Sequence, residues 1–326
     1  MSANRVEHDD LRSLSDADWV ARIAAIGDEA GSFERLGPSH FAFFADEGPT
    51  LLVTFETRDS IRRATPQQLP YGFAITRPRG WSLLSVVADG ATWFRDPAVY
   101  RYFDRLVDDA FFEDFDRVVF YGAGMCGYAA AAFSVTAPGA TVVAVQPQAT
   151  LDPLVAGWDP RFAERRRLCF TDRYGYAPDM TEGAGPVFVI YDPEQQLDAM
   201  HAALFRRPWT TLLPCRNLGR DVAGALDGMR VLPSVLAAAC TGALDATLFR
   251  TFYRARRNFP PYLRGLSGRL EADGRPLLNA LLCRNAVQRL NAPKFGARLA
   301  DLERQLGRAG VALPPSKAEG RPRSRP

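Results

Sequence analysis

Short apolar runs alternate along the first two thirds of the chain with segments whose apolar positions recur at helical spacing. Within each run most apolar residues follow one another directly rather than alternating with polar residues. This is typical of strands that are covered on both faces in a mostly parallel sheet. They span residues 41–44, 51–55, 72–76, 83–87, 118–121, 140–145, 186–191 and 210–213, and helical segments at 97–108, 126–135 and 197–206 lie between several of them. This order predicts an α/β protein with a doubly wound, mostly parallel sheet.

The pattern changes after residue 226, where the strand-like runs stop. Helical spacing continues through residues 232–239, 247–257, 261–271, 276–290 and 295–306. Near the other end of the chain, Ser15 or Asp16 can cap a helix that extends to about residue 28. We therefore expect an N-terminal helix within residues 1–30, an α/β core of residues 31–225, a helical subdomain of residues 226–310, and a tail of residues 311–326.

The tail is basic and proline-rich, and its composition predicts disorder. It carries four basic residues against Glu319, so the formal net charge of +3 lies in the tail and the rest of the 326-residue chain is balanced. Without the tail the chain has no net positive charge, whereas nucleic-acid-binding domains usually carry an excess of basic residues. We therefore expect no nucleic-acid partner.

Composition also bears on location and cofactors. The N-terminus is polar and acidic, unlike a signal peptide, and no apolar run approaches the ~18 residues that a membrane helix needs. These features predict a cytoplasmic protein without a membrane partner. The five cysteines are scattered without a C-x-x-C pair, which favours neither a disulfide framework nor a zinc site. We expect no cofactor and no metal.

Residues 118–130 form the stretch around which the rest of the chain is organised. Apolar residues lead into a turn with three glycines, and an alanine-rich segment of helix length follows. A nucleophile elbow, G-x-S-x-G, occupies the same strand–turn–helix context. On that pattern Gly122 is the first glycine, Gly124 stands where the serine would be, and Cys126 stands where the last glycine would be.

Further motifs follow the turn in a recognisable order. Pro147 and Gln148 come after the next strand, and Asp198, His201 and Ala202 lie on the helix after the strand that follows. Over about residues 51–226, the chain resembles a bacterial α/β-hydrolase-like family whose elbow reads roughly G-x-S-M-G-G-Y-A-A. The elbow residues that match are Gly122, Met125, Gly127, Tyr128, Ala129 and Ala130. The family usually has a histidine just after the last strand, and Arg220 occupies that place here.

The departures from the family pattern affect its chemistry. A serine hydrolase needs a hydroxyl on the turn and a base that accepts its proton. Gly124 has no side chain, and the guanidinium of Arg220 stays protonated. Loss of the nucleophile or the base alone costs on the order of 10⁶ in rate in a well-studied hydrolase. The resemblance therefore implies an α/β-hydrolase fold with a dismantled triad.

Such a protein can still bind a ligand or act as a scaffold. The N–H of Met125 at a helix N-terminus remains available to an anion, and Gly122 and Gly124 let a ligand approach the backbone. Gln148 follows a strand end, and Arg216 and Arg220 can clamp a carboxylate or phosphate, although surface solvation explains these arginines equally well. We expect a small ligand, anionic or acyl-like, at the turn.

Two other functions stay open. Cys126 can replace the serine of a hydrolase or acyltransferase, with His201 as base and Asp192 or Asp198 as its orienting acid. The alternatives are a buried cysteine, a helix histidine tied to a carboxylate, and an Asp–Pro turn at Asp192. The helical residues 226–310 can instead bind a protein partner. Sulfonucleotide reductase activity is disfavoured, because the chain lacks the Ser-Gly-Gly loop and the Glu-Cys-Gly segment that it requires.

Overall fold

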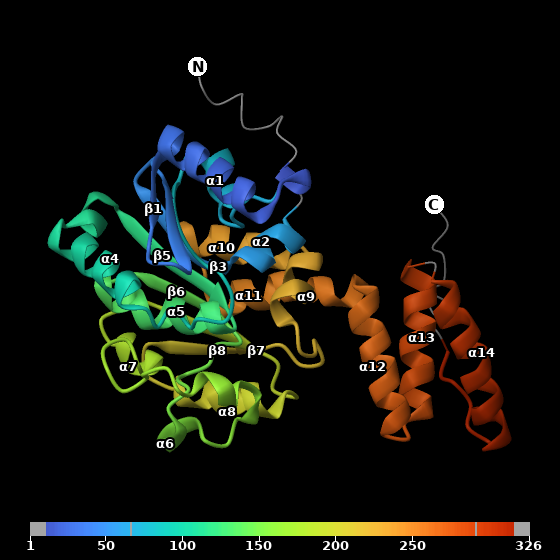
Figure 1. The fold of residues 1–326 in the computed structure, drawn as a ribbon. Coiled ribbons are helices and arrows are strands. Elements are labelled where there is room, and N and C mark those ends of the chain that lie inside the picture. Colours follow the sequence, from blue (N-terminus) through green and yellow to red (C-terminus); the bar gives the residue numbers. More distant parts are fainter. Residues whose placement is uncertain (1–10, 66, 291, 316–326) are drawn as a thin grey trace. The chain divides into compact units, whose positions relative to one another are not determined.

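The computed structural model describes residues 11–65, 67–290 and 292–315 (Figure 1). The predicted disorder of the tail therefore lies largely outside the described residues. The chain divides into two compact units, Met1–Phe252 and Tyr253–Pro326. The predicted boundary at residue 226 differs from this division, since the first helices after it belong to the first unit.

Among the described residues, the first unit is built on one eight-stranded sheet. Its strands are β1 (Gly31–Arg35), β2 (His40–Ala45), β3 (Thr50–Thr57), β4 (Ser82–Ala88), β5 (Arg117–Ala123), β6 (Thr141–Val145), β7 (Val187–Tyr191) and β8 (Thr210–Pro214). They lie in the order β1-β2-β4-β3-β5-β6-β7-β8. Only the pairs β1–β2 and β2–β4 are antiparallel among these strands. The prediction of a doubly wound, mostly parallel sheet is confirmed.

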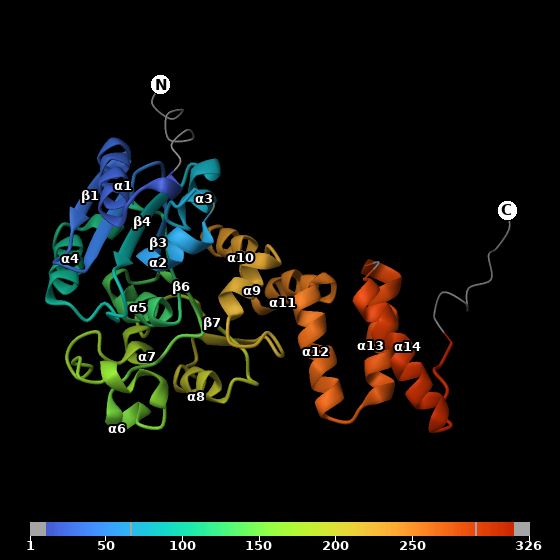
Figure 2. The same ribbon diagram turned by 45° about the vertical axis from the view of Figure 1, so that its right-hand side comes forward.

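Helices cover both faces of this sheet (Figures 1 and 2). The helices of this unit are α1 (Asp16–Ala30), α2 (Arg58–Ala64), α3 (Phe73–Thr76), α4 (Pro97–Asp108), α5 (Met125–Phe133), α6 (Pro153–Ala156), α7 (Ala177–Met180), α8 (Gln196–Leu204), α9 (Val222–Gly228), α10 (Val231–Cys240) and α11 (Ala246–Phe252). Ser15 caps α1, as the sequence predicts. No single helix of the described chain is long and apolar enough to cross a membrane; α9 and α10 meet the length and composition test only as a pair bent by 93°.

The two faces of the sheet differ at β3, because successive side chains of a strand point to opposite sides. On one face, the ring of Phe55 stacks on Phe103 of α4 and Phe133 of α5, with centroid distances of 5.8 and 5.5 Å. On the other face, Thr54 lies against Gly72 beside α3. Helix α10 packs against β3, β5 and β6. The central strands are therefore buried on both sides, and their carboxyl ends are held in place.

Two predicted segments around this region differ in the structure. Residues 72–76, predicted as a strand, form α3 and then the 3-10 turn η3 (Arg77–Arg79). A five-residue apolar run does not distinguish a strand from a buried helix by its pattern alone. Residues 58–69, which lie outside the predicted strands and helices, begin with α2, where Thr57 and Ser60 form a capping box. Helix α2 thus starts directly at the carboxyl end of β3.

The second unit contains three longer helices, α12 (Pro260–Ala272), α13 (Pro276–Leu290) and α14 (Pro293–Arg308), after the 3-10 segment η7 (Tyr253–Asn258). Leu263, Cys283 and Phe295 belong to its own hydrophobic core. The predicted helices are present here. A protein partner for residues 226–310 stays a prediction.

Candidate functional site

The turn after β5 leads directly from the strand into α5 through a glycine with positive φ. Gly124 lies between β5 and α5 with φ 58° and ψ −123°, and its N–H donates to the carbonyl of Val145 at 2.8 Å. A Cβ on Gly122 would collide with the backbone of Cys126. A Cβ on Gly127 would lie 3.1 Å from the Val145 carbonyl oxygen. Gly122 and Gly127 therefore allow the strand, the helix and β6 to approach one another closely.

Gly124 differs from these two glycines. A Cβ built on it has no atom within 4 Å, so the position has room for a side chain. Its positive φ is a strained conformation for other residues. The turn is therefore a sharp strand–helix junction with open space at its central residue, which carries no side chain.

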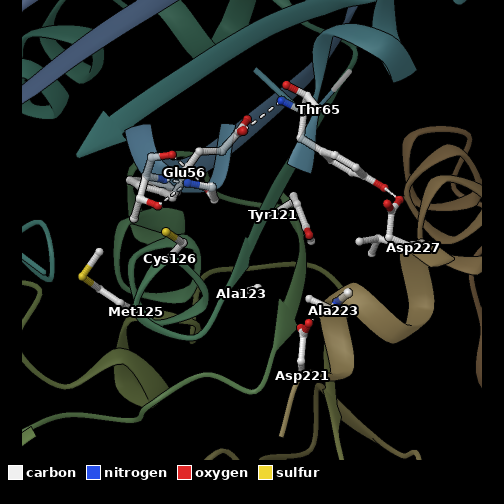
Figure 3. Close-up of a pocket in the computed structure, with 15 residues that line it drawn as sticks. Glu56, Thr65, Tyr121, Ala123, Met125, Cys126, Asp221, Ala223 and Asp227 are labelled. Carbon is white, nitrogen blue, oxygen red and sulfur yellow. Dashed lines mark hydrogen bonds between the residues drawn. The ribbon is translucent and has the colours of Figure 1, made fainter. Parts of the chain in front are cut away.

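A cavity of about 400 Å³ opens beside this turn (Figure 3). We call it the elbow cavity. It is lined by the end of β3 and the segment after it (Phe55, Glu56, Thr57, Ser60, Thr65, Tyr71), by β5 and the start of α5 (Tyr121, Ala123, Met125, Cys126), and by α9, its cap and α10 (Asp221, Ala223, Gly224, Asp227, Leu232). Its size is in the range of small-molecule sites. The carboxyl ends of strands are where open α/β sheets bind ligands.

Glu56 is the most buried carboxyl group of the elbow cavity, with 6% of the residue exposed. The Thr54 hydroxyl donates to its Oε1 at 2.7 Å, and the Tyr71 N–H donates to its Oε2 at 2.8 Å. Ser85 contacts Oε1 at 3.3 Å. Burial raises the pKa of Glu56 above its ordinary value, while these hydrogen bonds oppose the rise. No sequence motif singled out this residue.

Two tyrosines face the same space. The Tyr71 hydroxyl donates to Asp227 Oδ1 at 2.5 Å, which joins the segment after α2 to α9. The rings of Tyr71 and Tyr121 lie 6.0 Å apart. Tyr121 is 6% exposed, and its hydroxyl has no hydrogen-bond partner among the described residues. Burial raises the pKa of both phenols well above the usual value, so both keep their protons at neutral pH.

Cys126, the predicted replacement nucleophile, lines the elbow cavity but is 7% exposed. Burial, and then the nearby Glu56 carboxyl, raises the pKa of its thiol far above the ordinary value. The nucleophilic form of cysteine is the thiolate. The surroundings of Cys126 therefore suppress the form that an enzyme would need.

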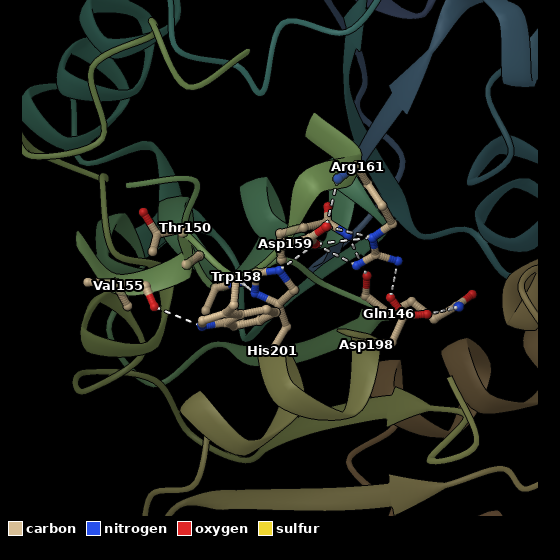
Figure 4. Close-up of polar contacts among 12 residues, drawn as sticks. Gln146, Thr150, Val155, Trp158, Asp159, Arg161, Asp198 and His201 are labelled. Carbon is tan, nitrogen blue, oxygen red and sulfur yellow. Dashed lines mark hydrogen bonds and ion pairs between the residues drawn. The ribbon is translucent and has the colours of Figure 1, made fainter. Parts of the chain in front are cut away.

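His201, the predicted base, does not line the elbow cavity. It is fully buried in α8, where its Nε2 lies 3.0 Å from Asp159 Oδ2 and its Nδ1 accepts the Ala149 N–H at 3.2 Å (Figure 4). Burial lowers its pKa, so the ring is neutral with the proton on Nε2. Both ring nitrogens are occupied by structural bonds. The predicted Cys126–His201 pair is absent from the described structure.

Asp198 belongs to the same polar network rather than to a catalytic pair. Its carboxylate accepts bonds from Arg161 at 2.6 Å and from the Gln146 side chain at 2.7 Å. The other side-chain atom of Gln146, Oε1, accepts the Val222 N–H at the start of α9 at 2.8 Å. The network thus fastens α8 and α9 to the carboxyl end of β6.

Asp192 lies directly after β7, where a triad acid would be. It is fully buried, and it accepts N–H groups from Glu194 at 2.9 Å, Asn217 at 3.3 Å and Gly219 at 2.8 Å. Two of these donors belong to the loop after β8 that would carry the triad histidine. The carboxylate therefore holds the backbone of that loop and orients no base.

The remaining predicted ligand-binding residues lie outside the elbow cavity. Arg216 forms an ion pair with Glu194 at 2.9 Å, and Arg220 is exposed. Gln148 is buried and its amide donates to the Gln146 carbonyl at 3.3 Å. The expectation of an anionic ligand rested on these arginines and on the Met125 N–H. The two arginines give it no support in the elbow cavity, and binding of a ligand at the Met125 N–H stays a prediction. Met125 lines the cavity as predicted.

No family model matches the sequence, and no curated protein sequence gives a significant match. Among solved structures, the chain is similar to an esterase from Pyrococcus furiosus, with 13% identity and a TM-score of 0.42 over 62% of this chain and 87% of that one. It is also similar to carboxyl esterase 2 from the fungus Tuber melanosporum, with 13% identity and a TM-score of 0.39 over 68% and 82%. A third is Est1E from Butyrivibrio proteoclasticus, with 10% identity and a TM-score of 0.42 over 65% and 97%.

The sheet order, the helices on both faces and the central strand–turn–helix together make this an α/β-hydrolase-like fold with C-terminal helices. Within the described residues, no group of three or more His, Cys, Asp or Glu side chains is arranged to hold a metal ion.

Proposed function

We propose that this protein binds a small-molecule ligand in the elbow cavity and does not hydrolyse esters by a serine mechanism. The supporting observation is Gly124, where the turn has open space but offers no hydroxyl. No histidine lines the cavity to act as a base. Without a nucleophile and a base, the cavity has no triad chemistry to perform.

The same geometry supports binding. The first N–H groups of α5 have no partner within the helix and lie beside the cavity. Aromatic and aliphatic side chains such as Phe55, Tyr121 and Leu232 provide apolar walls, and a few polar groups converge on the space. A mostly apolar pocket with a few directed polar groups is the usual form of a small-molecule site.

Two assays test this proposal together. Saturation-transfer NMR with a fragment mixture should detect ligands of the wild type that Ala223→Trp, which fills the elbow cavity, no longer binds. The matched control Ala272→Trp, on an exposed position of α12, should keep them. Hydrolysis of nitrophenyl acetate should not exceed the rate measured without protein.

A cysteine hydrolase would give a different result. Turnover of the ester that disappears in Cys126→Ala, together with rapid alkylation of Cys126 at neutral pH, would refute the absence of hydrolysis. Fragment binding that is unchanged by Ala223→Trp would refute the location of the site.

A further inference from the structure

The elbow cavity has an unusual charge balance. Three of its lining residues carry carboxyl groups, Glu56, Asp221 and Asp227, while no lysine, arginine or histidine is among them. Asp227 accepts the Tyr71 hydroxyl, and Asp221 caps α9 by accepting the Gly224 N–H at 2.8 Å. In Figure 3 the two aspartates lie on the α9 side of the cavity, and Glu56 and Cys126 lie on the opposite side.

Glu56 lacks a counter-ion. Its contacts include the Thr54 and Ser85 hydroxyls and backbone N–H groups of Tyr71 and Gly72, and no basic side chain among the described residues forms an ion pair with it. A buried charge is normally paired, because removing it from water costs several kcal/mol otherwise. Without such a partner the protonated acid is favoured, and a positive group in the cavity would stabilise the carboxylate.

Tyr121 gives an independent indication of a ligand. Its hydroxyl is a polar group on a residue that is only 6% exposed, it lines the cavity, and no described residue bonds it. A hydroxyl of a cavity residue that no described residue bonds is available to a ligand in that cavity. Tyr71 and Tyr121 line the same space, and aromatic rings attract ammonium groups.

From these features we infer that the elbow cavity binds an organic cation, a small alkylammonium compound, through Glu56, Asp227 and the aromatic rings of Tyr71 and Tyr121. The inference rests on the proposed function, because it names the ligand class of the same cavity. The ammonium group neutralises the carboxylates, and a hydroxyl or carbonyl elsewhere in the ligand bonds the free Tyr121 hydroxyl.

Calorimetric titration with matched probes tests the ligand class. The probes are choline, the uncharged alcohol in which a carbon atom replaces the choline nitrogen, and the anion tert-butylacetate; butylamine serves as a second cation. Choline should bind the full-length wild type at least tenfold more tightly than its uncharged counterpart, and tert-butylacetate should not bind. Glu56→Gln should remove this preference.

Control variants distinguish a loss of binding caused by the removed charge from one caused by unfolding. Glu164→Gln makes the same chemical change on an exposed residue outside the cavity and should leave choline affinity unchanged. Tyr121→Phe keeps the ring and removes the hydroxyl, so it should weaken choline severalfold while sparing butylamine, which has no hydroxyl. Thermal unfolding of each variant verifies that it is folded.

The outcomes distinguish the two proposals. Equal affinity for choline and its uncharged counterpart, or an affinity unchanged in Glu56→Gln, would overturn the cation assignment. If the uncharged probe or tert-butylacetate binds instead and Ala223→Trp abolishes that binding, the cavity is a ligand site of another class and the proposed function stands. Absence of saturable binding for both cations would overturn the inference, while the fragment experiment still decides the proposed function.

Discussion

Glu56 determines much of the behaviour of the cavity because it is a carboxyl group in a place that disfavours charge. Burial is the largest influence on its pKa and raises it, and the groups that face it are Tyr71, Tyr121, Cys126, Asp221 and Asp227. None of these groups carries a positive charge that would stabilise the carboxylate. The empty cavity therefore favours the protonated acid, and a bound cation favours the carboxylate.

The free energy of unfolding should depend on whether Glu56 is protonated. A carboxyl group whose pKa is raised by folding stabilises the native state below its unfolded pKa, near 4.5, and this contribution is lost as the pH rises through the folded pKa. The free energy of unfolding of the wild type should therefore fall relative to Glu56→Gln over that window. Urea titrations at a series of pH values measure the difference, and parallel curves for the two proteins would contradict it.

Ligand binding should show the opposite dependence. Choline affinity should rise with pH through the folded pKa of Glu56, because the carboxylate is the form that attracts the cation. Binding below that pKa should release a proton, which calorimetry detects as a dependence of the binding heat on the ionisation enthalpy of the buffer. An affinity that does not change with pH would exclude Glu56 as the partner of the ammonium group.

His201 illustrates a different kind of buried residue, one whose role is to hold the fold. Replacement by leucine removes its bonds to Asp159 and Ala149, and leaving such buried groups unpaired costs about 1–3 kcal/mol. The variant should unfold at lower urea concentration but retain ligand binding, since His201 lies outside the cavity. Loss of binding in a folded His201→Leu protein would contradict this assignment.

At the scale of elements, the glycine turn was predictable and its surroundings were not. The spacing of Gly122, Gly124 and Gly127 requires a tight strand–helix junction, which is a local property of the chain. Glu56 comes to the turn only because β3 pairs with β5, whereas its own segment reads as an ordinary strand end. The strand β1 has too few apolar residues to give a pattern, and it exists through its pairing along β2.

The candidate catalytic residues show the same limit. Sequence order places Cys126, Asp192 and His201 after successive strands, as in a triad. It does not reveal that Asp159, in the irregular segment after β6, forms a hydrogen bond with Nε2 of His201. Nor does it reveal that the Asp192 carboxylate accepts hydrogen bonds from backbone N–H groups. These partners are distant in sequence and follow no spacing rule.

The two turn glycines should respond differently to serine. Gly124→Ser has space for its side chain and should cost about 1–3 kcal/mol through the strained backbone alone. Gly122→Ser forces a Cβ into the backbone of Cys126 and should abolish cooperative folding. Denaturant unfolding with circular dichroism compares them. Equal losses would show that the close approach of β5 and α5 is not the constraint.

At the scale of the whole molecule, the division after Phe252 carries a consequence for truncation. Every lining residue of the elbow cavity lies in the first unit. A protein of residues 1–252 should therefore fold cooperatively and bind the same ligands as the full chain. A protein of residues 1–225 lacks α10 and exposes the apolar face of the central strands, so it should aggregate.

Size-exclusion chromatography and the fragment NMR assay compare the two truncated proteins. A folded, binding-competent protein of residues 1–225 would restore the boundary at residue 226 that the sequence pattern predicted. A protein of residues 1–252 that is folded but does not bind would show that the second unit contributes to the site.

The hydrogen bonds between Asp192 and the loop after β8 affect any attempt to engineer hydrolase activity into this protein. Installing a serine at position 124 and a histidine at position 220 would still leave the acid engaged with main-chain donors. The new imidazole would then have to share the carboxylate with three main-chain donors, which already use most of its acceptor sites. Hydrolysis on this scaffold would require a nucleophile, a base and an acid that is free to orient the base, so single substitutions should yield folded but inert proteins.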